Sequence, residues 1–105
     1  MGELDFGSMC RRHGLPEPTR QVLRALASGR AYLDVAWEDV GLVVEIDGGQ
    51  HSRALHPIGD ALRQNEITLG REIVLRLPVL GLRLAPDSFM GQVRRAHQLA
   101  SQRAA

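Results

Sequence analysis

Two short runs of alternating residues constrain the fold of this chain more than any other part of its sequence. In Tyr32 to Trp37 and in Leu42 to Asp47, every other side chain is apolar. Such alternation is typical of half-buried β-strands, because successive side chains point to opposite faces of a sheet. The four residues between the runs have the length of a hairpin connection. The sequence therefore predicts a β-hairpin with one apolar face. That face consists of Leu33, Val35, Trp37, Leu42, Val44 and Ile46.

Further patterns of apolar spacing predict helices and strands on both sides of the hairpin. In chain order they are a helix over Phe6–His13, a strand over Arg20–Leu26, a helix over Pro57–Leu69, a strand over Glu72–Leu77 and a helix from Pro86 onward. The complete order is helix, strand, strand, strand, helix, strand, helix. The chain has 105 residues, which suffice for one core. We therefore expect a single domain over residues 1–105 of the α/β (α+β) class, a sandwich around a small mixed sheet.

The other face of the predicted hairpin carries carboxylates. If the hairpin closes symmetrically around its two central residues, Asp34 lies directly opposite Glu45. Asp47 then lies on the same face, two residues further along the strand. Like charges this close destabilise a sheet unless a cation compensates them, and oxygen ligands of this kind suit Mg²⁺ or Mn²⁺. The sequence thus predicts a metal site at Asp34, Glu45 and Asp47. The alternative is that this face is solvated surface.

The basic residues are thirteen arginines and no lysine, and they are unevenly distributed. The absence of lysine excludes Schiff-base chemistry, Walker-type phosphate loops and a lysine general base. Residues 11–30 hold five arginines and one acid, residues 71–105 hold six arginines and two acids, and residues 31–70 hold two arginines and seven acids. An acidic centre between basic flanks suits a cleft for a polyanion with a cation at its centre. Scattered surface charge is the alternative.

Three further features bear on the compartment of the protein. The longest apolar run has five residues, Val40 to Val44, which is too short to span a bilayer. One cysteine, Cys10, excludes an internal disulfide. The N-terminal residues lack the basic-then-apolar pattern of a secretory signal. We therefore expect a cytoplasmic protein without a membrane partner.

At the hairpin and in segments that follow it, the sequence carries motifs that resemble those of a known family. The resemblance is carried by the run YLDVAWEDVGLVVEIDGGQH, by the spaced Asp60, Arg63 and Asn65, and by the late GREIVLRL. These motifs are similar to the Vsr-like domain family of unknown function. That family is placed near the very-short-patch repair endonucleases, in the restriction-endonuclease-like PD-(D/E)xK superfamily. The similarity extends through nearly the whole chain.

The resemblance implies a restriction-endonuclease-like three-layer α/β/α fold and Mg²⁺-dependent hydrolysis of phosphodiester bonds. By position, Asp34 matches the metal aspartate and Glu45 the acid of the second motif. Asp47 stands where the superfamily's lysine usually falls. His51 matches a histidine of this branch and, with no lysine available, is the candidate for water activation or phosphate positioning. Glu3 matches the acid of the first helix.

The arginine-rich flanks supply the predicted nucleic-acid contacts. The candidates are Arg11, Arg12, Arg76, Arg94 and Arg95. Folding into one domain should set at least some of the flanking arginines around the acidic centre. These are Arg11, Arg12, Arg20 and Arg24 on one side and Arg94, Arg95 and Arg103 on the other. Arg76 is also a candidate for stabilising negative charge that develops during the reaction. The expected partner is nucleic acid, with DNA favoured.

Two functions stay open at this point. The first is a Mg²⁺- or Mn²⁺-dependent endonuclease. The second is a catalytically inactive nuclease-fold module that binds nucleic acid or regulates a partner, in the manner of an antitoxin, because fold alone does not carry function. A homodimer, and a place at the C-terminal end of a longer protein, are further expectations.

Overall fold

A computed structural model describes residues 5–26, 29, 31–48 and 57–105. Four strands of this part of the chain form one mixed sheet, in the order β1 (Arg20–Ala25), β2 (Ala31–Trp37), β3 (Leu42–Asp47) and β4 (Ile73–Pro78). The strands β1, β2 and β3 are antiparallel neighbours, whereas β4 pairs with β3 in parallel. A parallel pair needs a crossover connection, and the segment that contains α2 (Pro57–Leu69) supplies it.

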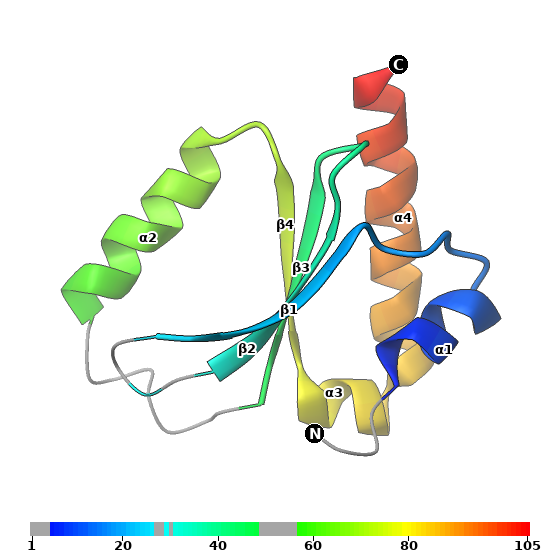
Figure 1. The fold of residues 1–105 in the computed structure, drawn as a ribbon, viewed down its shortest axis with the longest axis horizontal. Coiled ribbons are helices and arrows are strands. Elements are labelled where there is room, and N and C mark those ends of the chain that lie inside the picture. The colour runs from blue at the N-terminus through cyan, green and yellow to red at the C-terminus, as the bar shows by residue number, and fades with distance from the viewer. Residues whose placement is uncertain (1–4, 27–28, 30, 49–56) are drawn as a thin grey trace.

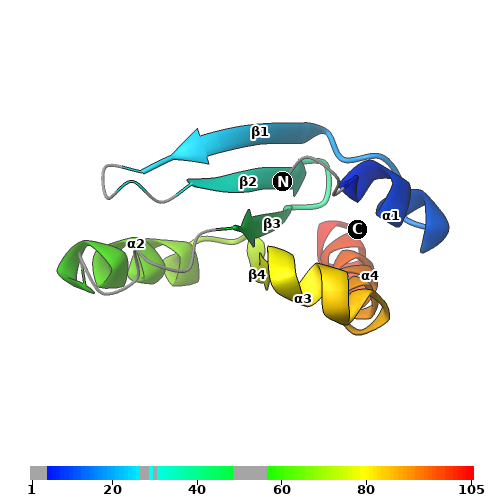
Figure 2. The ribbon, with the colours of Figure 1, turned by 90° about the horizontal axis from the view of Figure 1, so that it is seen from below.

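The helices lie on both sides of this sheet. Among the described residues, α2 lies on one side and three helices lie on the other (Figure 1). The three are α1 (Phe6–Arg12), α3 (Val79–Leu84) and α4 (Pro86–Ala104). Seen from below, α2 and α3 lie on either side of β4 (Figure 2). The predicted α/β class and the small mixed sheet are confirmed.

The predicted hairpin is confirmed together with its register. Asp34 lies opposite Glu45, and Tyr32 lies opposite Asp47. The strand β3 has the predicted bounds, and β2 begins one residue earlier than predicted. The turn between them ends at Gly41, whose φ of +75° is a left-handed conformation that favours glycine.

The apolar face of the sheet packs against α1 and α4. Its side chains are fully or almost fully buried at Val35, Trp37, Leu42, Val44 and Ile46, with Leu33 partly buried beside them. The ring of Trp37 meets Phe6 of α1 and His97 of α4, each edge to face. Its indole N–H donates to the carbonyl of Pro16 at 2.9 Å. The predicted core face is therefore confirmed.

The helix α3 is missing from the predicted order, which ends with one helix instead of two. Its six residues are too few to show a helical period, and Gly81 in its middle argues against a helix by propensity. The structure gives that glycine a packing role. A Cβ at this position would lie 2.5 Å from a ring atom of Phe89 in α4. The helix forms because it packs closely against α4, a tertiary contact that local sequence does not reveal.

The helix α2 has the predicted bounds, but its apolar stripe is not buried. Ile58, Leu62 and Leu69 are 63–79% exposed. The stripe is therefore exposed, unlike the stripes of α1 and α4. No helix in the described ranges is both long and apolar enough to cross a membrane.

Candidate functional site

The registers of the strand pairs place one row of side chains across all four strands. Val22 of β1 lies opposite Asp34, and Asp34 lies opposite Glu45. Glu45 in turn lies beside Arg76 of β4. These paired residues share the face of the sheet that α1 and α4 leave uncovered. Both acidic residues are buried, each with 7% of its surface exposed.

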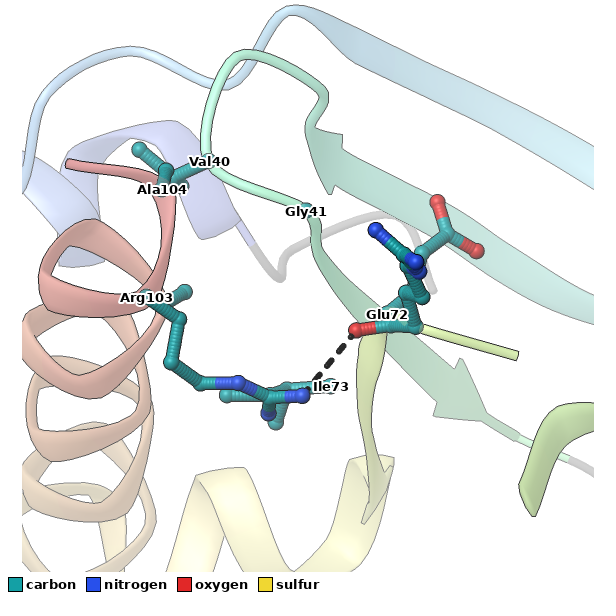
Figure 3. Close-up of a pocket in the computed structure, with 8 residues that line it drawn as sticks. Val40, Gly41, Glu72, Ile73, Arg103 and Ala104 are labelled. Carbon is teal, nitrogen blue, oxygen red and sulfur yellow. Dashed lines mark hydrogen bonds between the residues drawn. The ribbon is translucent and has the colours of Figure 1, made fainter. Parts of the chain in front are cut away.

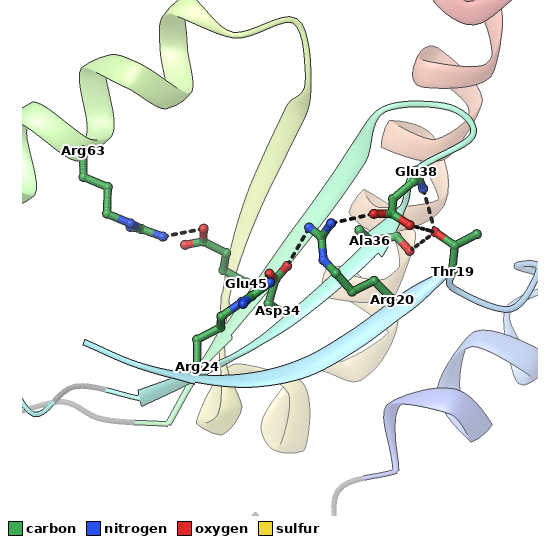
Figure 4. A network of polar contacts seen from close by, with 8 residues as sticks. All are labelled: Thr19, Arg20, Arg24, Asp34, Ala36, Glu38, Glu45 and Arg63. Atoms are coloured by element: carbon green, nitrogen blue, oxygen red, sulfur yellow. Dashed lines mark hydrogen bonds and ion pairs between the residues drawn. The ribbon is translucent and has the colours of Figure 1, made fainter. Parts of the chain in front are cut away.

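Two arginines of β1 hold both carboxylate oxygens of Asp34 (Figure 4). Arg20 donates to Oδ1 at 3.1 Å, and Nε of Arg24 donates to Oδ2 at 2.9 Å. The two arginines are four residues apart in one strand, so their side chains share a face. Arg20 also donates to Glu38 at 2.8 Å. The hydrogen bond to Asp34 is the largest cause that raises the pKa of Arg20 above its usual value.

Two other arginines lie against Glu45. Arg63 of α2 donates to Oε2 at 2.6 Å, and Nε of Arg76 lies 3.4 Å from Oε1. Within the described residues, the buried Oε1 accepts no hydrogen bond. Glu45 therefore has a buried oxygen that is ion-paired with Arg76 but accepts no hydrogen bond from the described residues. We call Asp34, Glu45, Arg20, Arg24, Arg63 and Arg76 the carboxylate–arginine cluster.

Arg63 connects α2 to the sheet (Figure 4). Its guanidinium carbon lies 5.2 Å from the centroid of the Tyr32 ring, a cation–π distance. Burial lowers the pKa of Arg63, but its hydrogen bonds and charge interactions with Glu45 and Tyr32 outweigh that effect and raise the pKa. The sequence shows Arg63 as part of a motif, and its contact with a carboxylate was not predicted.

The cluster explains how the fold accommodates two opposed carboxylates. Such a pair requires a compensating cation, and four guanidinium groups of the chain itself provide positive charge. In the part of the chain that the structure describes, no group of three or more His, Cys, Asp or Glu side chains is placed to hold a metal ion. Asp47 is partly buried on the same face, opposite Tyr32.

The carboxylate pair nevertheless fits a magnesium ion chemically. Mg²⁺ is usually held by one or two carboxylates, and waters and substrate phosphates complete its six ligands. Asp34 and Glu45 provide two such carboxylates, and the buried Oε1 of Glu45 accepts no hydrogen bond from the described residues. Occupation of the pair by a cation would require the arginines to move away from it.

The remaining predicted site residues fall into two groups. His51 and Glu3 lie outside the described residues. Four of the arginines proposed to bind nucleic acid lie on α1 and α4, across the sheet from the carboxylates; they are Arg11, Arg12, Arg94 and Arg95. The structure does not bring these four together with Asp34. It does bring Arg76, Arg20 and Arg24 there, and the last two are among the flanking arginines of which some were expected around the acidic centre.

A hollow of about 390 Å³ lies at the turn end of the hairpin, against the end of α4 (Figure 3). Its lining includes two arginines, Arg71 and Arg103, and one acid, Glu72. Arg103 donates to the carbonyl of Arg71 at 3.5 Å. The hollow shares no residue with the carboxylate–arginine cluster.

Comparisons with known proteins return no relative: no family model, no curated protein and no solved structure matches this chain.

Proposed function

We propose that this chain is a Mg²⁺- or Mn²⁺-dependent endonuclease domain that hydrolyses phosphodiester bonds of nucleic acid, with DNA as its substrate. The observation that carries this proposal is the buried pair of Asp34 and Glu45, directly opposed on β2 and β3, with one oxygen of Glu45 that accepts no hydrogen bond from the described residues. Buried carboxylates that face each other across a hairpin are costly to the fold, so a functional reason for them is favoured.

In this proposal the opposed carboxylates of Asp34 and Glu45 hold the metal ion. Asp47, the third predicted ligand, lies on the same face, but the described residues form no three-carboxylate group. The ion, when bound, lowers the pKa of a coordinated water and neutralises charge on the scissile phosphate. Arg76 lies beside Glu45 in the row across the sheet, and in this proposal it contacts phosphate oxygens. His51 activates the water or positions the phosphate, which is the role that the family resemblance implies.

The same proposal gives the domain a restriction-endonuclease-like three-layer fold. Its support is a mixed sheet with α2 on one side and α1 and α4 on the other, as in Figure 1. We further propose that the domain works in the cytoplasm, with DNA as its partner and a homodimer as its assembly.

The test is cleavage of supercoiled plasmid and of single-stranded DNA by purified protein in Mg²⁺, Mn²⁺ or EDTA. We expect metal-dependent cleavage by the wild type, and E45Q should lose about a hundredfold or more, because the ion's stabilisation of the reaction is worth several kcal/mol. D39N removes the same charge from the exposed hairpin turn and should cleave normally. Cleavage that persists in E45Q would contradict the proposed site.

A second function is favoured by one specific observation. Both oxygens of Asp34 are held by arginines, so this carboxylate is neutralised without a metal ion. A module of this kind could bind nucleic acid and cleave nothing. Metal-independent DNA binding, together with no cleavage by the wild type under any of the conditions above, would select this function.

A further inference from the structure

The four arginines of the cluster differ in how firmly they are held. Arg20 and Arg63 are largely buried, with 27% and 28% of their side chains exposed. Each has a second partner, Glu38 for Arg20 and the Tyr32 ring for Arg63.

Arg24 and Arg76 are held less firmly. Their side chains are 46% and 43% exposed, and each contacts its carboxylate through Nε. Among the described residues, their terminal amino groups have no hydrogen-bond partner. A guanidinium bound in this way still presents its outer N–H groups to solvent. It can therefore leave its carboxylate with little loss of packing.

We propose that Arg24 and Arg76 are exchangeable counter-ions, which neutralise Asp34 and Glu45 in the free protein and pass to phosphate oxygens of nucleic acid when a divalent cation takes the carboxylates. This inference rests on the proposed function and adds the source of its phosphate-binding groups. Arg24 lies on β1 and Arg76 on β4, so the two flank the carboxylate pair from opposite edges of the sheet.

Charge and geometry both support the exchange. A divalent ion at the carboxylates repels guanidinium groups at short range and competes for the same oxygens. A released guanidinium matches a phosphate with two parallel hydrogen bonds, which an ammonium group cannot reproduce. Binding of the cation and binding of nucleic acid should therefore be coupled, because both favour the state in which the two arginines have left the carboxylates.

The exchange predicts opposite effects on the two ligands. Removing Arg24 or Arg76 removes a competitor of the cation and a contact of the phosphate. We therefore expect R24Q and R76Q to bind Mn²⁺ about three- to tenfold more tightly and a DNA duplex about tenfold more weakly. R83Q removes the same charge from an exposed position on α3 and should change neither affinity appreciably.

Mn²⁺ affinity is measured by electron paramagnetic resonance without DNA, and duplex affinity by fluorescence anisotropy in saturating Ca²⁺, a divalent ion that takes the same oxygen ligands. R24K separates the two roles of Arg24, because it keeps the charge and loses the planar fork. We expect R24K to bind Mn²⁺ as the wild type does and to bind the duplex more weakly. Thermal unfolding of each variant shows whether it is folded. If R24Q is not folded, the affinities of R76Q alone test the proposal.

The outcomes separate this inference from the proposed function. Mn²⁺ affinities of R24Q and R76Q that equal that of R83Q would overturn the exchange, even if the wild type cleaves DNA. Tighter Mn²⁺ binding with weaker duplex binding would support the exchange, even if no cleavage is found. A wild type that does not bind Mn²⁺ would overturn both.

Discussion

Asp34 is the residue on which the folded carboxylate–arginine cluster depends most. Its buried carboxylate accepts hydrogen bonds from two arginines, and it is the group that holds Arg20 and Arg24 on one face of β1. Hydrogen bonds between charged partners are stronger than neutral ones, and a buried guanidinium that loses its partner is destabilising.

We therefore expect D34N to lower the free energy of unfolding by about 1–3 kcal/mol in EDTA. The amide keeps the shape of the side chain, so the loss of stability measures the contribution of the negative charge. Urea denaturation at neutral pH measures it. E38Q removes the exposed carboxylate that also contacts Arg20 and should lose less than about 1 kcal/mol. Equal losses in the two variants would contradict the dominant role of Asp34.

Cys10 gives a pH dependence at the same scale. It lies in the core, and burial raises the pKa of its thiol to about 11 from an ordinary value of 9.0. Between these values the unfolded chain releases the thiol proton and the folded chain keeps it. Stability from this group is therefore complete below about pH 9 and declines towards pH 11, by up to about 1.4 kcal/mol per pH unit. Alkaline denaturation should show a shallower decline for C10A than for the wild type, and parallel declines would show that the thiol does not contribute.

At the scale of elements, the contact between α3 and α4 depends on Gly81. A Cβ there would meet two ring atoms of Phe89, at 2.5 and 2.9 Å. Overpacking of this kind costs about 1–3 kcal/mol and outweighs the helix propensity gained, which is about 1 kcal/mol.

We therefore expect G81A to be destabilised by up to about 2 kcal/mol. At Gly91 of α4 an added Cβ would have no atom within 4 Å, so G91A should gain about 0.5–1 kcal/mol. Thermal or urea unfolding of the two variants should thus shift in opposite directions. A shift of G81A to higher stability would mean that Phe89 moves aside freely.

The elements differ in how far the sequence could predict them. The hairpin and its Asp34–Glu45 pairing were predictable because alternation and a short connection together determine the register. The partners of those carboxylates were harder to predict. Arg20 and Arg24 come from a strand with weak alternation, and Arg63 comes from a helix whose placement depends on a crossover. Their approach to the cluster is tertiary, so spacing along the chain does not encode it.

Two further differences between the predicted and the observed elements also arise from tertiary contacts. The helix α3 is too short for a period, and its stability comes from packing on α4. The apolar stripe of α2 has the spacing of a core-facing helix but is exposed in the structure. Spacing predicts that a helix has an apolar face, and it does not identify the surface that covers that face.

For the whole molecule, the sheet separates two groups of arginines. One group belongs to the carboxylate–arginine cluster, and the other lies on α1 and α4 on the opposite side. Removing one phosphate-binding arginine should reduce the slope of log affinity against log salt by about 0.9 on duplex DNA. The salt dependence of variants therefore identifies the face to which DNA binds.

We expect the double variant R24A/R76A to reduce that slope by about one to two. The double variant R94A/R95A, which removes the same charge from α4, should leave the slope close to that of the wild type. Anisotropy titrations over a range of salt concentrations measure both. The reverse result would place DNA on the helical face and would support the nucleic-acid contacts that the sequence predicted there.

Trp37, which joins α1, the sheet and α4, has a practical consequence. It is the chain's single tryptophan, and its side chain is buried on the face of the sheet opposite Asp34. Its fluorescence emission should follow the separation of the core layers and stay nearly constant while ligands bind across the sheet. The fluorescence of Trp37 therefore reports unfolding of the protein without responding to ligands at its candidate site.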